Sequence, residues 1–471
     1  MIKLRIKDIA NAVDGRLIQG SGDSWINGVS TDSRTIKNGE LFFALKGPRL
    51  DGHKFVDDVL KKGAAGAVVS AECGMRNAEF PLIAVDDTLS ALGNLARYWR
   101  ERHPVPLIAV SGTCGKTTTK EMIASILKTS RPVVKTEGNL NNLIGLPLTL
   151  FGLNNIHKAA VVELGISEKG EMKRLAHICR PYVAVLTNIG EAHTAMLGSR
   201  EGVASAKGEL FEGMGMNGTA VINSDDPWLA KMGSAIRTKK ITFSLTSKAD
   251  VMLKGEGQGG RPLGAVKGQE IIFIVMGEEI PVRLQYVGTH NLSNAAAAIA
   301  AAIPLGATRE EIQEGLASAV PLRGRMEVVA MKNGITIIDD TYNANPLSME
   351  ASLKSLASMN GRKIAVLGDM LELGDISHAA HKYIGGLAQE MGIDMFFVIG
   401  NFSKDFISGA TEAGMTADKI YEAKGKVGLV ETLHGIMREG DNILIKGSRA
   451  MKMEEVVEKL QDTSCKTQVK K

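Results

Sequence analysis

The chain of 471 residues has only four cysteines and no long uninterrupted apolar run. Cys73, Cys114, Cys179 and Cys465 lack the C-x-x-C spacing of a structural zinc site and the density of a disulfide-stapled domain. No apolar stretch approaches the roughly 20 residues that span a bilayer. The N-terminus carries charges every few residues and lacks a signal-peptide core. We therefore expect a cytoplasmic protein without stable membrane insertion.

A strong charge of one sign is also absent. The 56 basic and 52 acidic side chains give a formal net charge of +4, and no basic cluster is interleaved with aromatics. This balance argues against a nucleic-acid partner. No segment indicates an obligate interface, so we expect a monomer. Because 471 residues exceed a single ordinary core, the length favours roughly three domains.

The most informative motif is a glycine-rich loop that follows an apolar, strand-like run at residues 107–110. Its residues are Gly112, Thr113, Cys114, Gly115, Lys116, Thr117 and Thr118, and a helical pattern follows. Two glycines let backbone N–H groups surround a phosphate chain, and the helix N-terminus favours the anion. Lys116 would reach the terminal phosphates and the Thr117 hydroxyl would bind Mg²⁺. The loop predicts a nucleoside triphosphate site, rather than a glycine turn beside a surface lysine.

The pattern of apolar runs predicts three α/β domains. Residues 1–85 mix short strand-like runs with turns, and a helical pattern over residues 89–102 ends at a proline-rich segment near the first boundary. Apolar strands alternate with helices over residues 86–321 and again over residues 322–471, as in parallel sheets covered by helices. We predict a small α/β N-terminal domain, a central P-loop parallel-sheet ATPase domain and a C-terminal Rossmann-like α/β domain.

A glutamate and a histidine lie near the ends of two strands of the predicted central sheet. Glu163 ends the apolar run that begins at residue 159, and His193 ends the segment that follows the next run. Ligands gather at the carboxyl ends of parallel strands, so both should face the phosphate loop. Glu163 would complete the Mg²⁺ shell that Thr117 begins, and His193 would hold a second metal. The alternatives are a capping or solvated glutamate and an ordinary polar histidine.

Two further residues, Lys207 and Asn294, have no clear role when each is considered alone. Lys207 lies in a helical stretch and by itself is typical of a surface lysine. Asn294 lies near the start of an alanine-rich helix, where its amide could hydrogen-bond a purine edge, because it presents a donor and an acceptor side by side. The alternative is helix capping by Asn291 or Ser293.

Together these motifs resemble the Mur ligase family, the ATP-dependent amino-acid and peptide ligases of bacterial cell-wall synthesis. The resemblance covers essentially the whole chain. Five features occur in the family's order: GTxGKTT, the Glu at the strand end, TNIGxAH, the Lys-Gly-Glu after it, and HNxxNA. Segments 136–147, 324–326, 338–346 and 446–449 look like the branch that adds D-alanyl-D-alanine to UDP-N-acetylmuramoyl-tripeptide (UDP-MurNAc-tripeptide). Cys114 departs from the Asn or Ser typical of the family, which should shift nucleotide affinity without abolishing it.

The resemblance implies a mechanism through an acyl phosphate. The γ-phosphate of ATP would convert the tripeptide carboxylate to an acyl phosphate, which the amine of D-Ala-D-Ala attacks. Lys116 and two Mg²⁺ ions would offset the negative charge. The resemblance assigns the first ion to Thr117 and Glu163 and the second to His193. It also implies that CO₂ carbamylates Lys207, so that Lys207 supports the second ion.

The resemblance further assigns residues to the three substrates. Asn294 and the phosphate loop would bind ATP, and Arg325 and Asp340 would reach its phosphate and ribose when the C-terminal domain closes. The UDP-sugar end would contact Ser33, Arg34, Asp51, His53, Asn139 and Asn142. The dipeptide side would be formed by Asp339, Tyr342, Asn343, Asn345, Lys446, Ser448 and Arg449. The alternatives are a solvated Asp339-Asp340 loop pair and an Arg325 surface salt bridge.

Two other functions compete with this hypothesis. Another amide ligase of the superfamily could add a single amino acid to UDP-MurNAc or glutamate to folate, but segments 338–346 and 446–449 argue against both. A nucleotide switch or carrier would leave His193 and Asn294 unexplained. The third peptide residue, lysine or diaminopimelate, stays open.

Overall fold

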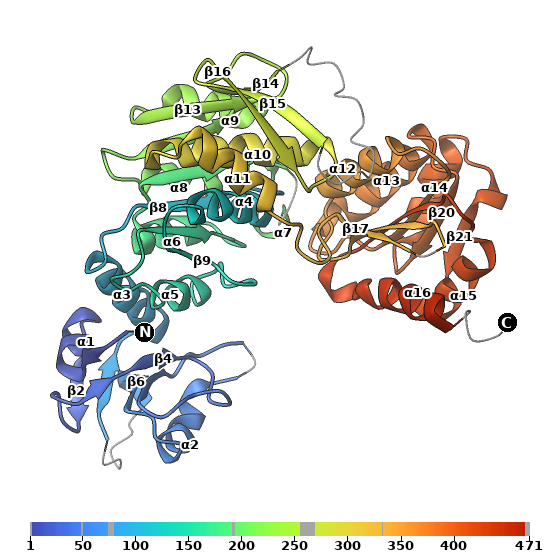
Figure 1. Ribbon diagram of the computed structural model, residues 1–471. Helices are drawn as coiled ribbons and strands as arrows, with labels where there is room; N and C mark the ends of the chain where they lie inside the picture. Colours follow the sequence, from blue (N-terminus) through green and yellow to red (C-terminus); the bar gives the residue numbers. More distant parts are fainter. Residues whose placement is uncertain are drawn as a thin grey trace.

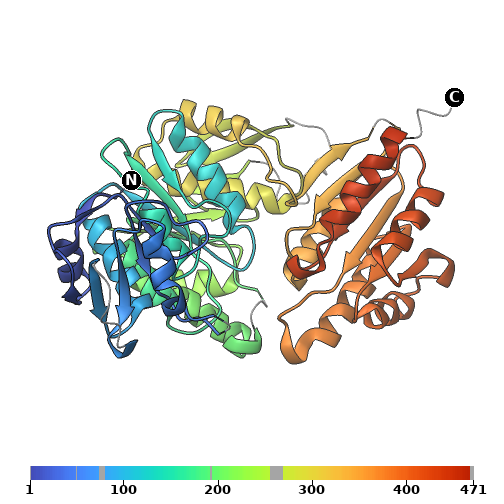
Figure 2. The same ribbon diagram turned by 90° about the horizontal axis from the view of Figure 1, so that it is seen from below.

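Four β-sheets organise the described part of the computed structural model, and three of them form the cores of separate bodies (Figure 1). In both views the C-terminal body, coloured orange to red, lies to the right of the other two (Figure 2). The structure describes residues 2–48, 50–73, 80–190, 194–254, 269–331 and 333–466.

The N-terminal body contains a five-stranded sheet and a two-stranded one. The larger sheet has the order β2 (Arg16–Gln19), β7 (Leu82–Val85), β6 (Gly66–Ser70), β5 (Glu40–Phe43) and β4 (Gly28–Ser30). Only its β2–β7 pair is antiparallel. The smaller sheet pairs β1 (Leu4–Arg5) with β3 (Trp25–Ile26). The helices of this body are α1 (Ile6–Ala12) and α2 (Val56–Lys61).

The central body is built on a nine-stranded sheet. Its order is β16 (Glu278–Leu284), β15 (Gln269–Val275), β14 (Val251–Leu253), β13 (Lys239–Ser244), β12 (Thr219–Asn223), β11 (Val183–Leu186), β8 (Leu107–Ser111), β10 (Ala159–Glu163) and β9 (Val133–Lys135). The strands from β14 to β9 are parallel, whereas β14, β15 and β16 pair antiparallel. The predicted, mainly parallel sheet of the central domain is therefore confirmed, and the antiparallel strands β15 and β16 extend it at one edge.

Helices cover both faces of this sheet because its strands are apolar on both sides. Ile108 and Val110 of β8 pack toward one helix layer, and Leu107 and Ala109 pack toward the other. The first layer contains α4 (Lys116–Lys128), α10 (Thr289–Ala302) and α11 (Arg309–Ser318). The second contains α3 (Thr88–Glu101), α5 (Gly145–Leu150), α6 (Glu171–Cys179), α8 (Arg200–Glu212) and α9 (Pro227–Ala235), with the short α7 (Thr194–Leu197) beside α8.

The chain changes direction beside β8, and this places the site. The helix α4 after β8 covers one face of the sheet, and the helix α6 after the neighbouring β10 covers the other. The two connections therefore diverge and open a crevice at the carboxyl ends of these strands, where α/β sheets bind ligands. The phosphate loop and Glu163 both lie at this crevice.

The C-terminal body is a six-stranded sheet in which only β17 is antiparallel. Its order is β17 (Glu327–Ala330), β18 (Thr336–Asp340), β22 (Asn442–Lys446), β19 (Lys363–Gly368), β20 (Met395–Ile399) and β21 (Ile420–Ala423). One face carries α12 (Pro346–Ala357), α13 (Ser377–Glu390) and α14 (Ser403–Glu412), and the other carries α15 (Lys426–Ile436) and α16 (Glu454–Lys466).

The predicted α/β class with three parallel-rich bodies is thus confirmed, while the boundaries at 85/86 and 321/322 remain predictions. Among the described residues, no helix has the length and apolarity needed to cross a membrane.

Close packing of α11 on α4 yields a stability prediction. A Cβ built on Gly315 of α11 would lie 2.3 Å from the Cα of Ile126 in α4. Backbone cannot rotate away as a side chain can, so Gly315→Ala should force the helices apart. We expect a destabilisation of about 1–3 kcal/mol, measured as a lower midpoint in thermal unfolding followed by circular dichroism.

The matched control for this variant is Gly435→Ala in α15, where an added Cβ meets nothing within 4 Å. That change should be neutral or stabilising, because alanine favours helix over glycine. Equal midpoints for the two variants would contradict the predicted clash at Gly315.

Candidate active site

The phosphate loop connects β8 to α4, and close contacts impose glycine at both of its ends. Gly112 and Gly115 have φ values of 141° and 80°, a region that favours glycine. A Cβ on Gly112 would lie 2.0 Å from Thr187 Oγ1, and one on Gly115 would lie 2.2 Å from Asn294 Oδ1. The GTxGKTT motif therefore folds as the predicted strand, loop and helix.

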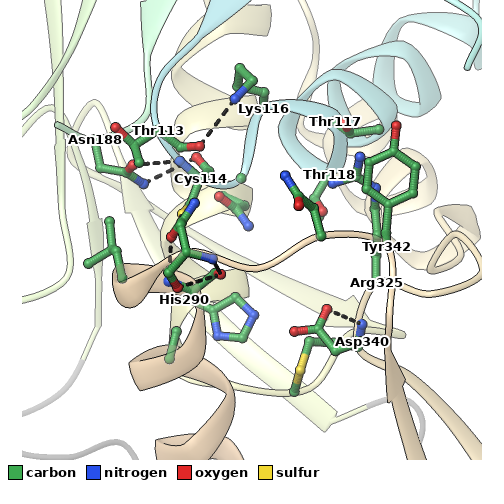
Figure 3. Close-up of a pocket in the computed structure, with 18 of the residues that line it drawn as sticks. Thr113, Cys114, Lys116, Thr117, Thr118, Asn188, His290, Arg325, Asp340 and Tyr342 are labelled. Carbon is green, nitrogen blue, oxygen red and sulfur yellow. Dashed lines mark hydrogen bonds between the residues drawn. The ribbon is translucent and has the colours of Figure 1, made fainter. Parts of the chain in front are cut away.

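Hydrogen bonds from the segment after β11 fix this loop. The Cys114 N–H donates to Asn188 Oδ1 at 2.8 Å, and the Thr113 N–H donates to the Asn188 carbonyl at 3.0 Å (Figure 3). Lys116 Nζ donates to the carbonyls of Gly112 and Thr113 at 2.9 and 3.1 Å. The ammonium thus lies against the loop that is expected to cradle phosphates.

Glu163 is a buried carboxylate beside the first turn of α4. Its Oε2 accepts from Thr117 Oγ1 at 2.7 Å, and its Oε1 accepts from Asn141 Nδ2 at 2.8 Å. The residue is 3% exposed, so the interpretation as a solvated or capping glutamate is wrong. A carboxylate next to a threonine hydroxyl offers the oxygen ligands that Mg²⁺ prefers.

The predicted second metal position depends on His193, which lies outside the described residues. Among the residues that the structure describes, no three His, Cys, Asp or Glu side chains gather as a metal cluster. The fit to Mg²⁺ therefore rests on Thr117 and Glu163, and Mg²⁺ commonly keeps several waters and few protein ligands.

Lys207 of α8 is buried beneath the loop, so its interpretation as a surface lysine is wrong. The residue is 2% exposed and its Nζ donates to the Gly112 carbonyl at 3.1 Å. Burial, followed by the nearby charge of Lys116, lowers the pKa of Lys207 to about 7. A large part of this amine is therefore neutral at neutral pH.

Asn294 is buried in the first half of α10 and faces the cavity beside the loop. Its Nδ2 donates to Asn291 Oδ1 at 2.9 Å, and its Oδ1 accepts from Thr119 Oγ1 at 3.3 Å. Neither Asn291 nor Ser293 caps the helix, which starts after Gly288 without a side-chain cap. The capping interpretation is wrong, and an amide for purine recognition remains the prediction.

Asp340 is buried and ion-paired, which overturns its interpretation as a solvated loop residue. Its Oδ2 accepts from Lys446 Nζ at 2.5 Å and from Ser352 Oγ at 2.7 Å. Burial alone would raise the pKa of Asp340, but the Lys446 ammonium and the Ser352 hydroxyl together lower it. Asp339 points to the other face of β18, accepts from Thr341, and does not line the cavity.

Arg325 stacks on an aromatic ring instead of making the surface salt bridge considered above. Its guanidinium carbon lies 3.9 Å from the centroid of Tyr342 (Figure 3), and it pairs with no carboxylate of the described residues. Arg449 lies 5.7 Å from the same ring and pairs with Glu454. The cationic Arg325 therefore stays available to a ligand.

The remaining residues predicted for the dipeptide side have defined places near α12. Asn345 caps this helix by accepting from the Ser348 N–H at 2.9 Å. The Asn343 carbonyl accepts from Lys446 Nζ at 3.0 Å. Ser448 is buried, and its Oγ accepts from the Leu371 N–H, so it fixes a loop outside the cavity.

The central and C-terminal bodies together enclose one cavity of about 510 Å³. Lys116 and Glu163 line it from one side, and Arg325 and Asp340 line it from the other. Cys114 Sγ donates to Asn345 Oδ1 at 3.3 Å across the junction, and burial raises the pKa of this thiol. The loop and the C-terminal body are therefore in direct contact.

Sequence reasoning missed several residues that line this cavity, among them Asn141, Asn188 and His290. Each lies inside a sequence motif described above, so its place in that motif could have identified it as a residue of the site. Burial lowers the pKa of His290 to about 4, so its imidazole is neutral at neutral pH. It makes no hydrogen bond to a described residue and is free to contact a ligand.

The residues predicted for the UDP-sugar end come from two bodies of the fold, and four of them belong to the N-terminal body. Asp51 bonds His53 Nδ1 at 2.6 Å, and the Ser70 N–H donates to His53 Nε2, so both ring nitrogens have protein partners. Arg34 is exposed and pairs with Asp32, while the Ser33 carbonyl accepts from Lys62.

Two further residues predicted for this end belong to the central body. Asn142 lines the main cavity and accepts from the N–H groups that start α5, and Asn139 is exposed in the same segment. The UDP-sugar assignments therefore cover surfaces of two bodies.

Comparison with known proteins gives consistent matches along the chain. The Mur ligase family catalytic domain matches residues 25–100, the Mur ligase middle domain matches residues 110–302, and the Mur ligase glutamate ligase domain matches residues 324–449. The UDP-N-acetylmuramoyl-tripeptide--D-alanyl-D-alanine ligase of Bacillus subtilis is 38% identical over 98% of this chain and 99% of its own length. Its Escherichia coli counterpart is 35% identical at the same coverage.

Solved structures agree with these sequence matches. MurF from Acinetobacter baumannii superposes with a TM-score of 0.90 at 33% identity, covering 98% of this chain and 99% of its own. MurF ligase from Thermotoga maritima in complex with ADP gives a TM-score of 0.84 at 30% identity, covering 94% and 98%.

The lowered pKa of Lys207 predicts a pH dependence of stability. Between about pH 7 and its ordinary value of 10.5, the unfolded chain binds a proton that the folded chain lacks. Through this group, the free energy of unfolding should therefore rise as pH increases from about 7 to 10.5, and it should level off at its lower value below pH 7, where both states bind the proton.

The measurement is denaturant unfolding of the wild type and Lys207→Met from pH 6 to pH 9 in CO₂-free buffer. The free energy of unfolding of the wild type, minus that of Lys207→Met, should increase as pH rises. Parallel curves would show that Lys207 titrates normally.

Proposed function

The chain belongs to the Mur ligase family, and we propose that it joins D-alanyl-D-alanine to UDP-MurNAc-tripeptide while converting ATP to ADP and phosphate. The observation that carries the proposal is the shared cavity, in which the phosphate loop faces Arg325 and Asp340 of the C-terminal body. The relatives at 38% and 35% identity carry this activity in their names and match the chain from end to end.

The reaction needs an activated carboxylate, because a carboxylate anion is a poor electrophile. Transfer of the γ-phosphoryl group of ATP gives an acyl phosphate, and the dipeptide amine then displaces phosphate through a tetrahedral intermediate. Both steps bring anions together. Lys116 and Arg325, on opposite sides of the cavity, supply positive charge where the phosphoryl group passes.

Thr117 and Glu163 would hold Mg²⁺, which when bound would offset charge on the ATP phosphates. Their buried, mutually bonded oxygens match the ligand preference of that ion. We assign the ATP base to Asn294 and the ribose side to Asp340, which Lys446 and Ser352 hold in place. His193 remains the proposed ligand of a second ion.

Lys207 is proposed to carry a carbamate. Its neutral Nζ would attack the carbon of CO₂, form an N–C bond and release one proton, which leaves an anionic group beside the loop. The amine pKa of about 7 supports this step, because the deprotonated amine is the nucleophile. A buried anion at this position would also balance the charge of Lys116.

The remaining assignments complete the proposal. We assign four residues of the N-terminal body to the UDP-sugar region: Ser33, Arg34, Asp51 and His53. Asp51 and His53 would stabilise this region through their bonds to each other and to the Ser70 N–H. Tyr342 and its neighbours on the C-terminal body are assigned to the dipeptide side. We further propose that the protein works as a cytoplasmic monomer.

The decisive test is phosphate release from ATP with each substrate omitted in turn. A ligase of this type should release phosphate only when both UDP-MurNAc-tripeptide and D-Ala-D-Ala are present, and mass spectrometry should find the pentapeptide product. ATP hydrolysis that ignores both substrates would instead support a nucleotide switch. Turnover with a single amino acid or with folate and glutamate would assign another ligase.

Replacement of Lys116 tests the phosphate loop. Lys116→Ala should abolish ligation and leave the fold intact, because its ammonium serves a transferring phosphoryl group, where such charges contribute on the order of several kcal/mol. Product formation and circular dichroism would be measured together. Lys128→Ala, at the exposed end of the same helix, is the control and should keep normal turnover. Near-normal turnover of a folded Lys116→Ala protein would refute the assignment.

Replacement of Lys207 tests the carbamate. With ¹³C-bicarbonate, the wild type should show a carbamate carbon by NMR that Lys207→Ala lacks. The variant should lose most activity, high bicarbonate should not restore it, and acetate should rescue part of it by filling the vacated space. An unmodified lysine in the wild type, together with normal turnover of the variant, would overturn the proposal.

A further inference from the structure

Lys120, a second lysine of the helix α4 that follows the phosphate loop, is buried but does not line the active-site cavity. It lies one turn after Lys116 on α4 and is 1% exposed. Its Nζ donates to the Thr136 carbonyl at 2.5 Å and lies 2.8 Å from Glu121 Oε1. Lys120 therefore connects α4 to the segment that follows β9.

Thr136 continues this connection to the strand that carries the candidate metal ligand. Its Oγ1 accepts from the N–H of Glu163 at 3.0 Å, and its own N–H donates to the Val161 carbonyl at 3.1 Å. The residue is fully buried. One threonine thus receives the lysine on its carbonyl and holds the backbone of Glu163 with its hydroxyl.

The same segment then reaches the carboxylate itself. Five residues after Thr136, Asn141 donates from Nδ2 to Glu163 Oε1, and its carbonyl accepts from the Gly165 N–H at 2.9 Å. Thr117 of α4 contacts the other carboxylate oxygen. Glu163 is thereby fixed at its backbone and at both oxygens, by α4 on one side and by the segment from 136 to 141 on the other.

Stability alone does not account for this lysine. Removing an ammonium from water is costly, and buried ion pairs often stabilise a protein no more than an apolar side chain of similar size. Glu121 has a second cation in Lys135, 2.5 Å from its Oε2, so the carboxylate does not require Lys120. What Lys120 alone supplies among the described residues is the donor to the Thr136 carbonyl.

We propose that Lys120 is a positioning residue for the cation site, holding the segment from 136 to 141 against α4 so that Asn141 and Glu163 keep their orientation. This inference rests on the proposed use of Glu163 and Thr117 for Mg²⁺. Groups that orient metal ligands commonly change metal affinity 10–100-fold when removed, which sets the size of effect to look for.

The test uses Mn²⁺ as the probe, because its free ion is counted directly by electron paramagnetic resonance. The full-length protein would be titrated with Mn²⁺ in the presence of a non-hydrolysable ATP analogue. Lys120→Met keeps an apolar stem, removes the donor, and leaves Glu121 paired with Lys135. We expect Mn²⁺ binding to weaken about tenfold or more, while binding of the analogue without metal stays unchanged.

Three comparison variants make the result specific. Lys128→Met, on the exposed part of α4, should bind Mn²⁺ as the wild type does. Thr136→Val removes the hydroxyl that holds Glu163 but keeps the carbonyl that accepts from Lys120, so it should weaken Mn²⁺ binding in the same direction. Thr136→Ser keeps the hydroxyl and should restore it. If Lys120→Met does not fold, Thr136→Val tests the link to Glu163 through which Lys120 would act, and wild-type Mn²⁺ binding by folded Thr136→Val would overturn the inference.

Each outcome separates this inference from the proposed function. Weakened Mn²⁺ binding in Glu163→Gln, with wild-type binding in folded Lys120→Met and Thr136→Val, would overturn the role of Lys120 alone. Unchanged binding in Glu163→Gln would refute the cation site itself. In ligation assays, saturating Mg²⁺ should recover most of the kcat of Lys120→Met. A loss of kcat that Mg²⁺ does not relieve would show a merely structural role.

Discussion

The hydrogen bond from Thr117 to Glu163 is the interaction on which the site depends. It ties the first turn of α4 to the end of β10, across the crevice from which α4 and α6 leave on opposite faces of the sheet. A buried carboxylate is unfavourable unless hydrogen bonds satisfy it, and here both oxygens are engaged. The carboxylate is thus held at a fixed point beside the phosphate loop. A cation such as Mg²⁺ could there replace the Thr117 hydroxyl proton as its partner.

Three buried lysines around the site differ in what balances their charge. Lys446 is paired with Asp340 and Lys120 with Glu121, so each ammonium has a carboxylate within 2.8 Å. Lys207 donates to one backbone carbonyl, makes no ion pair with a described residue, and feels the charge of Lys116, which is another cation. Burial, followed by the nearby charge of Lys116, lowers the pKa of Lys207 to about 7. Because no described residue supplies an anion to this lysine, a group that brought its own negative charge would balance it.

The sequence predicts the elements and motifs of this structure better than it predicts side-chain partners. Alternation of apolar strands and helices predicts the parallel sheets, because both faces of each strand must be covered. The glycine spacing predicts the phosphate loop. Asp339, by contrast, was grouped with the dipeptide-side residues, although neighbours on a strand face opposite ways. The burial of Lys207 depends on residues 95 positions away, and no local pattern reports such a contact.

The position of the C-terminal body follows from what the chemistry would require. An acyl phosphate is destroyed by water, and the central body alone leaves the phosphate loop open on one side. The C-terminal body supplies the opposite wall through Arg325 and Asp340, and the contact between Cys114 and Asn345 joins that wall to the loop. A thiol is a weak hydrogen-bond donor, so this one contact by itself adds little to the junction. Because residues of both bodies line the cavity, closure of the C-terminal body would exclude water and bring the cationic Arg325 to the phosphoryl group at the same time.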